Sequence, residues 1–283
     1  MASPEQRRTA TAGAAIETAG LGFAYGDRTT LDGIDLRVEP GKVVGLLGPN
    51  GSGKSTLIKV LSKVLEGYEG SARIDGDEVR SISSRDLART MAVVPQESTF
   101  GFPFSALEIV LMARHPHLAG LAFESDRDIR IARESLDRCG ALAFESRTIH
   151  DLSSGERQRV VFARALAQEP RVLLLDEPAS FLDIRHQVEL YDIVRSKATE
   201  DGCSVLTVLH DLNLAAEYCD RIYLLREGRI EAGGPTAEVF TYANLTRVFE
   251  TEVYVDTNDL TGKLLVVPLS GRARERLRGD QGG

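Results

Sequence analysis

The sequence lacks a long hydrophobic run. No stretch approaches ~18 consecutive apolar residues, the length that a membrane-spanning helix needs, so the chain is not expected to cross a bilayer. Residues 1–15 contain two arginines but no apolar segment, so no secretory signal is expected either. We therefore expect a cytosolic protein that reaches a membrane only through its partners.

An excess of positive charge is also missing. The formal net charge is −8, which argues against a nucleic-acid-binding protein. Cysteine is scarce, and the spacing of Cys139, Cys203 and Cys219 fits neither a metal site nor a redox pair. We expect three reduced and mostly buried thiols. The 283 residues, 42% of them hydrophobic, allow one large domain or two small ones with a sizeable core.

Short strand-like runs alternate with helical stretches along the chain. This alternation predicts an α/β fold with a mostly parallel sheet. The segment Ala106–Cys139 has helical spacing and no good strand, which indicates a helical insertion. The polar tails, 1–14 and 271–283, are expected to be poorly ordered. The expected strands are Val43–Leu47, Met91–Val94, Val172–Leu175, Val205–Leu209 and Ile222–Leu225, and the expected helices are Ser55–Leu65, Glu156–Gln168, Arg185–Thr199 and Leu212–Tyr218.

A phosphate-binding loop follows the first of these strands. Its glycines let backbone N–H groups surround a phosphate, and the following helix adds a favourable dipole. The lysine of such a loop reaches the β- and γ-phosphates, and the hydroxyl after it is a hard ligand for Mg²⁺. The alternative is a glycine-rich turn that binds nothing, but a chance match is on the order of one in a hundred. The predicted ATP-binding residues here are Gly48, Pro49, Asn50, Gly51, Ser52, Gly53, Lys54, Ser55 and Thr56.

Two carboxylates end the buried run Val172–Leu175. Asp176 is predicted to hold the Mg²⁺ shell, and Glu177 to polarise the attacking water as a general base. By itself, such a pair is more often a strand end at a solvated turn. The upstream phosphate loop favours the functional interpretation.

The motif that separates P-loop families from one another lies shortly before this strand. Leu152-Ser-Ser-Gly-Glu156, followed by Arg157-Gln-Arg, resembles the signature Leu-Ser-Gly-Gly-Gln of ABC transporter ATPases. In that family Ser153 and Gly155 would open a helix that binds the γ-phosphate held by the other subunit of a dimer. Ser154 replaces the usual first glycine, and Glu156 stands where glutamine is common. The alternative is an ordinary helix N-cap.

Four more positions resemble landmarks of the ABC family. The resemblance implies that Tyr25 stacks on adenine, that Gln96 contacts Mg²⁺ or water, that Asp183 lies at the dimer interface and that His210 bonds the γ-phosphate. Without the resemblance, the alternative interpretations of these four residues are a strand-edge tyrosine, a loop glutamine, a helix N-cap and a strand-end histidine. Their order along the chain matches the family throughout. His115 and His117 flank Pro116 and are expected in a surface turn rather than at a metal.

The resemblance implies a P-loop core with a helical subdomain and a small antiparallel β part. The ABC domain would span about 15–250, with the helical subdomain at about 96–152 and a C-terminal extension at 251–270. It further implies a head-to-tail homodimer with each ATP between Lys54 of one copy and Ser153 of the other. Permease subunits, a substrate-binding protein and a place on the cytoplasmic face of the cell membrane would follow.

Other classes fit less well. ABC proteins of translation usually carry two cassettes, and repair members carry long coiled coils or zinc hooks, whereas heptads and cysteine pairs are missing here. A simple P-loop kinase would lack the signature and the histidine. An exporter cassette stays open as an alternative.

The cargo is suggested only by resemblance. Glu108-Ile-Val-Leu-Met-Ala-Arg-His-Pro-His117, Leu182-Asp-Ile-Arg-His-Gln187 and Leu209-His-Asp-Leu-Asn213 resemble importers of iron–siderophores, haem and vitamin B12. The other interpretation is that these segments mark a generic importer, and the choice among the three cargoes stays open.

Overall fold

The computed structural model describes residues 14–118 and 123–272. A six-stranded sheet forms its centre, with the order β10-β9-β3-β8-β7-β6. All neighbours in it are parallel except β10, which pairs antiparallel with β9. The predicted mostly parallel α/β fold is therefore confirmed. The strands are β3 (Val43–Leu47), β6 (Met91–Val94), β7 (Val172–Asp176), β8 (Ser204–Val208), β9 (Arg221–Arg226) and β10 (Arg229–Pro235).

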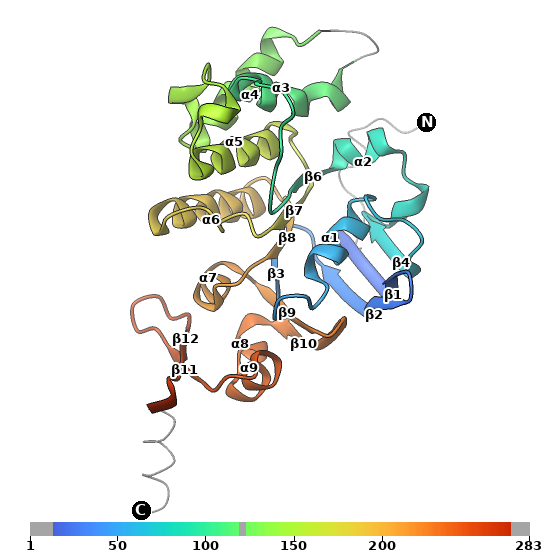
Figure 1. Cartoon of the computed structure of the whole chain (residues 1–283), viewed down its shortest axis with the longest axis vertical. Coiled ribbons are helices and arrows are strands. Elements are labelled where there is room, and N and C mark those ends of the chain that lie inside the picture. The colour runs from blue at the N-terminus through green and yellow to red at the C-terminus, as the bar shows by residue number, and fades with distance from the viewer. Residues whose placement is uncertain (1–13, 119–122, 273–283) are drawn as a thin grey trace, which may run out of the picture.

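Two apolar cores cover the two faces of this sheet. Strand β3 shows the division, because alternate side chains of a strand point to opposite faces. Val43 and Leu47 join the core under the helices, whereas Val44 and Leu46 join the core under α1 and the second sheet. The helices on the first face are α5 (Ser154–Ala167), α6 (Ile184–Thr199) and α7 (Leu212–Tyr218) (Figure 1).

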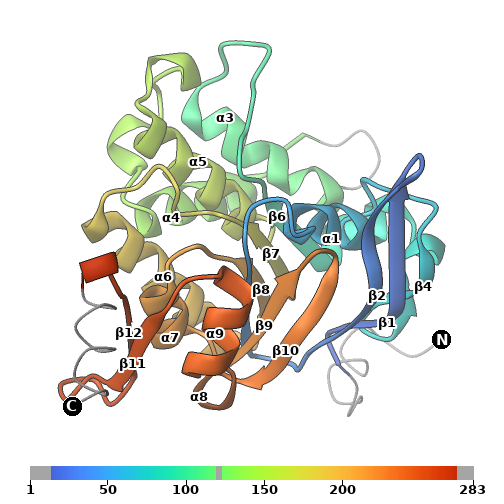
Figure 2. The ribbon, with the colours of Figure 1, turned by 60° about the horizontal axis from the view of Figure 1, so that its bottom comes forward.

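A second, antiparallel sheet packs against α1 (Lys54–Leu61) on the other face (Figure 2). This sheet is the small antiparallel part that the resemblance implied. Register shifts interrupt the pairing of β1 with β2, so their sequences do not alternate cleanly. The strands are β1 (Ile16–Tyr25), β2 (Arg28–Val38), β4 (Glu69–Ile74) and β5 (Asp77–Glu78).

The predicted helical insertion is broken by a 3-10 segment, η3 (Met112–His117), which contains Pro116. Arg114 of this segment is buried, and its guanidinium contacts Asp128 at 3.0 Å, Glu169 at 2.9 Å and the Ala167 carbonyl at 2.6 Å. The segment is therefore fixed to its neighbours. The helices and short 3-10 turns around it are η2 (Val79–Ser81), α2 (Ser84–Thr90), α3 (Ala106–Leu111), α4 (Asp126–Arg138), η4 (Leu142–Phe144) and η5 (Ile149–Asp151).

Two local predictions need correction. The first helix ends at Leu61 rather than Leu65, because Lys63 takes a positive φ of 59° and the chain turns there. His115 and His117 lie in a 3-10 helix rather than a turn; His115 is exposed, and Nε2 of the half-buried His117 lies 2.9 Å from the Gln168 carbonyl oxygen. The three cysteines are reduced and buried, as predicted.

The C-terminal part continues with α8 (Thr236–Val239), α9 (Tyr242–Phe249) and a hairpin of β11 (Val253–Thr257) and β12 (Leu264–Pro268). The tails were predicted at 1–14 and 271–283, and residues 1–13 and 273–283 of them lie outside the described residues. Within the described ranges, no helix is long and apolar enough to cross a membrane.

Candidate active site

The phosphate loop is shaped by two glycines that no other residue could replace. Gly48 has a φ of 153°, and a Cβ there would lie 1.9 Å from the Leu225 carbonyl oxygen. Gly53 has a φ of 108°, and its Cβ would lie 2.8 Å from the Thr30 carbonyl oxygen. The loop therefore threads between β9 and β2 before α1 begins at Lys54. The resulting backbone cradle fits a phosphate, which needs close approach to N–H groups.

Lys54 is nearly buried, with 5% of its surface exposed. Its Nζ donates to the carbonyl oxygens of Gly48 at 2.8 Å and Pro49 at 2.9 Å. Burial lowers the pKa of this ammonium group, while the nearby Glu177 and Asp176 act in the opposite direction. The loop thus holds its cation in the cradle, where a phosphate would take over the carbonyls' role as acceptor.

Ser55 and Asp176 form a pair of hard oxygen groups. The Ser55 hydroxyl donates to Oδ1 of Asp176 at 3.1 Å. Burial raises the pKa of Asp176, and the bond from Ser55 opposes this effect. A divalent cation would favour the ionised carboxylate, so this donor set fits Mg²⁺. Ser52 adds a buried hydroxyl that has no hydrogen-bond partner within the described part of the chain.

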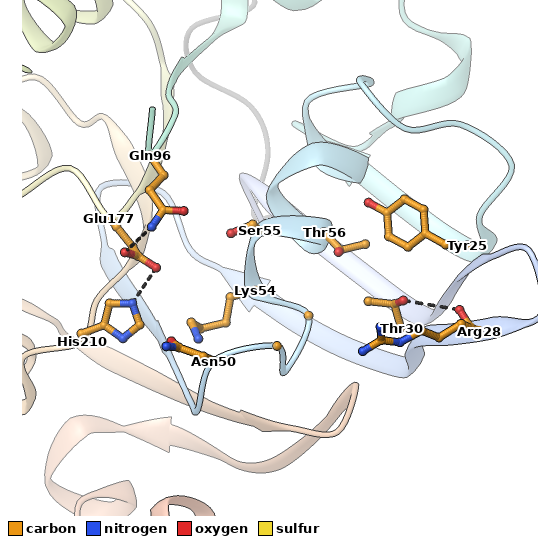
Figure 3. A pocket seen from close by; sticks show the side chains of 12 residues that line it. Tyr25, Arg28, Thr30, Asn50, Lys54, Ser55, Thr56, Gln96, Glu177 and His210 are labelled. Atoms are coloured by element: carbon orange, nitrogen blue, oxygen red, sulfur yellow. Dashed lines mark hydrogen bonds and ion pairs between the residues drawn. The ribbon is translucent and has the colours of Figure 1, made fainter. Parts of the chain in front are cut away.

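Glu177 is held in an uncommon backbone conformation directly after β7. Its φ is 51°, in the left-handed region that non-glycine residues seldom adopt. Its carboxylate lies 2.5 Å from Nε2 of His210 and accepts from Nε2 of Gln96 at 2.8 Å (Figure 3). Ser180 Oγ is a third partner, at 3.2 Å. Gln96, predicted as a metal ligand, is thus bonded to the predicted base in this structure.

Lys54, Ser55, Gln96, Glu177 and His210 line one cavity of about 600 Å³. Figure 3 shows Glu177, Gln96 and His210 at one side of it, the loop with Lys54 in the middle and Tyr25 at the other side. Tyr25 is 47% exposed and contacts Phe23 edge to face, with 5.0 Å between the ring centroids. The lining residues are Tyr25, Arg28, Thr30, Asn50, Gly51, Gly53, Lys54, Ser55, Thr56, Gln96, Glu177 and His210.

Arg28 and Thr30 are the lining residues that the sequence analysis missed. Tyr25 pairs with Arg28 across the turn between β1 and β2, so both face the same cavity. The Gly26-Asp27 pair directly after Tyr25 is a hairpin signal that could have pointed to them. Pro49 and Ser52 line a smaller neighbouring pocket, which also borders Asn50 and Gly51.

Gly48, Pro49, Ser52 and Asp176 adjoin the main cavity through the phosphate loop and β7 without lining it, whereas Ser153, Gly155 and Asp183 belong to other segments of the chain. Ser153 caps α5 in a capping box with Glu156, accepting from the Glu156 N–H at 3.3 Å. Gly155 lies beside the chain at Phe181, where a Cβ would be 3.4 Å from the carbonyl oxygen. Asp183 caps α6 and contacts Nδ1 of His186 at 2.8 Å. In a single copy these residues act as helix caps and loop contacts.

Comparison with known proteins decides the family. The ABC transporter family matches residues 31–180. The hemin import ATP-binding protein of Streptomyces coelicolor is 45% identical over 249 residues, which cover 88% of each chain. This chain belongs to the ABC transporter family.

Other ABC relatives carry different cargo names. The cobalamin import ATP-binding protein of Halobacterium salinarum is 37% identical over 91% of this chain and 64% of its own length. The iron(3+)-hydroxamate import ATP-binding protein of Bacillus subtilis is 36% identical over 88% of this chain and 92% of its own length.

Solved ABC structures share the fold. One is an inward-facing ABC transporter assigned to the metal-chelate type, with a TM-score of 0.79 and 27% identity over 92% of this chain and 99% of that one. Another is a dimeric cassette in a post-hydrolysis state with ADP and Pi, with a TM-score of 0.71 and 27% identity over 78% of this chain and 98% of that one. The chain is accordingly an ABC-type ATPase that binds and hydrolyses ATP.

Proposed function

We propose that this chain is the ATP-hydrolysing subunit of an ABC importer for an iron chelate, haem or vitamin B12. The observation that supports an ATPase best is the single cavity that holds the phosphate loop together with Tyr25, Gln96, Glu177 and His210. The names of the relatives, which import hemin, cobalamin and iron(3+)-hydroxamate, support the cargo class.

In the proposed reaction each group in the cavity has its own task. Tyr25 stacks on the adenine, and the loop N–H groups with Lys54 bind the phosphates. Glu177 accepts a proton from the water that attacks the γ-phosphorus, and ADP leaves as phosphate forms. His210 and Gln96 contact the Glu177 carboxylate in this structure, and His210 would turn to the γ-phosphate when ATP is bound.

Mg²⁺ is part of this proposal. Ser55, Asp176 and Gln96 would hold it, and it would supply charge neutralisation for the phosphate oxygens. The contact of Ser55 with Asp176 supports the first two ligands. Gln96 would have to exchange its bond to Glu177 for the metal shell.

A second copy of the chain completes the proposed site. Ser153 and Gly155 lie at the start of α5. Neither of them is among the residues that line the ATP cavity of the same copy. In a head-to-tail homodimer they would face the γ-phosphate bound by the partner copy, with Asp183 at the interface. Phe181, 47% exposed, and Ile184, 81% exposed, are apolar neighbours of Asp183 that such an interface would cover.

The membrane partner is proposed to be a multispanning permease served by a substrate-binding protein, with this chain peripheral on the cytoplasmic face. Within the chain we propose the ABC domain at about 15–250, its helical subdomain at about 96–152 and an extension at 251–270. A nucleic-acid partner is not proposed, since the net charge is −8.

Reconstitution with the cognate permease and binding protein tests the proposal. ATPase activity should rise when the binding protein carries a siderophore, haem or vitamin B12. Stimulation only by an amino acid, sugar or phosphate would show that the cargo class is wrong and leave the ATPase assignment intact. Lack of ATP hydrolysis in the assembled complex would contradict the proposed function itself.

A further inference from the structure

The C-terminal hairpin is attached to the helix that follows His210. Figures 1 and 2 both show β11 and β12 beside α7. Besides apolar packing in the main core, the attachment includes Asn213, whose Oδ1 accepts from the Val266 N–H at 2.8 Å and whose Nδ2 donates to the Val266 carbonyl at 3.2 Å. The amide therefore pairs with both backbone groups of one β12 residue, as a neighbouring strand would.

The short segment between Asn213 and His210 is held by hydrogen bonds of its own. Asp211 caps α7 and accepts from the N–H groups of Asn213 at 2.7 Å and Leu214 at 3.0 Å. His210 directly precedes this cap and follows the loop residue after β8. The first turn of α7 is thus connected to the backbone of His210 through the cap residue Asp211.

The other end of α7 is fixed to α6. Tyr218 donates its hydroxyl hydrogen to Asp192 at 2.9 Å, and its ring lies 5.4 Å from the ring of Tyr191. The first turn packs Leu212 and Leu214 against the main core, and Asn213 adds its two hydrogen bonds to the hairpin. Val266 is 2% exposed and belongs to the main core, so β12 offers a rigid support. Asn213 itself is exposed, which limits what its side chain can contribute to global stability.

We propose that Asn213 is a positioning residue for His210: it fixes the start of α7 to the C-terminal hairpin and so directs the imidazole toward Glu177 and the γ-phosphate. This positioning role rests on the proposed role of His210 in hydrolysis.

The experiment compares Asn213→Ala and Asn213→Asp with the wild-type chain. Alanine removes both hydrogen bonds to Val266, whereas aspartate keeps an acceptor for the Val266 N–H and places a second oxygen against the Val266 carbonyl. Asn244→Ala is the matched control, because Asn244 of α9 donates to the Val239 carbonyl at 3.0 Å and is not among the described residues that line the cavity. All chains are first compared by thermal unfolding.

The direct measurement is the ¹⁵N NMR spectrum of the histidine rings in the isolated full chain. The His210 signals are assigned by their loss in His210→Gln. Both Asn213 variants should shift or broaden these signals and leave those of His150 and His186 in place, whereas Asn244→Ala should leave all three unchanged. Unchanged His210 signals in both Asn213 variants would overturn the proposal, whatever happens to activity.

Kinetics in the reconstituted complex give the second arm. A small misplacement of a catalytic group lowers the rate of the chemical step and leaves the binding of ATP largely unchanged. We therefore expect kcat to fall about 5- to 10-fold, with KM for ATP within about twofold of the wild type. An equal loss in Asn244→Ala, or an unchanged kcat in both Asn213 variants, would contradict the assignment. Since the NMR arm needs neither cargo nor turnover, its result is independent of whether the proposed importer function holds.

Discussion

The carboxylate of Glu177 and Nε2 of His210 are 2.5 Å apart, although 33 positions separate them in the sequence. Glu177 directly follows β7 and His210 comes two residues after the neighbouring parallel strand β8, so the carboxyl ends of the two strands bring them together. The contact occupies one carboxylate oxygen. Gln96 and Ser180 contact the other, so these three partners take most of the acceptor positions of the Glu177 carboxylate in this structure.

Replacing Glu177 by Gln should lower ATP turnover by at least ~10²-fold, as expected for the loss of a general base. ATP binding should persist, because the phosphate loop is unchanged, and an ATP-bound dimer should accumulate. Turnover in the assembled complex and size-exclusion chromatography with ATP measure the two effects. Glu189→Gln, an exposed carboxylate paired with Arg185, is the control and should retain full activity. Near-normal turnover in the Glu177 variant would remove it as the base.

An equimolar mixture of Lys54→Ala and Ser153→Arg chains should regain nucleotide crosslinking relative to either variant alone. A hybrid head-to-tail dimer has one site with both groups intact and one site with both damaged. The labelling of an ATP analogue in the mixture is compared with the mean of the two separate samples. A value equal to that mean would mean that each copy binds ATP without its partner.

Replacing Tyr25 by Ala should weaken ATP binding about 10-fold, since stacking on a base is worth about 1–3 kcal/mol. Tyr25→Phe keeps the ring and should bind ATP almost as the wild type does. Titration calorimetry with ATP and with tripolyphosphate separates base from phosphate recognition. The alanine variant should bind tripolyphosphate normally, and a parallel loss for both ligands would contradict adenine stacking.

Asp128 should make stability depend on pH. Hydrogen bonds from the Ser125 hydroxyl and N–H, aided by Arg114, lower its pKa to about 2 against the opposing effect of burial. Because the folded pKa lies below the unfolded value of about 3.9, this contribution is complete above the unfolded pKa and is lost as pH falls toward 2.

Asp128→Asn should therefore lower the free energy of unfolding by about 3 kcal/mol at neutral pH, because it breaks a buried ion pair. The difference from wild type should narrow between about pH 4 and pH 2. Denaturant unfolding at a series of pH values measures it. Glu145→Gln, whose partner Arg133 is 53% exposed at its side chain, should cost less than about 1 kcal/mol. A difference for Asp128→Asn that stays constant with pH would refute the argument.

The sequence by itself determined the features that depend on neighbouring residues. The bounds of Val43–Leu47, Met91–Val94 and Leu212–Tyr218 agree with the structure, because each apolar run is bordered by residues that end it. The phosphate loop was also readable, since its glycines, lysine and serine are consecutive and their chemistry is local. The prediction that the first helix reaches Leu65 was wrong, because the chain takes a left-handed conformation at Lys63. A glycine, the usual sequence signal for such a turn, is not present at that position.

Only the tertiary structure decided which distant groups meet. The parallel order β8-β7 sets His210 against Glu177, and the β1–β2 hairpin brings Arg28 and Thr30 to the cavity. The double hydrogen bond of Asn213 to Val266 spans 53 positions, and the sequence pattern shows only one end of it. Such contacts depend on sheet order and on packing across the core, which are properties of the whole chain and leave no periodic signal in the local sequence.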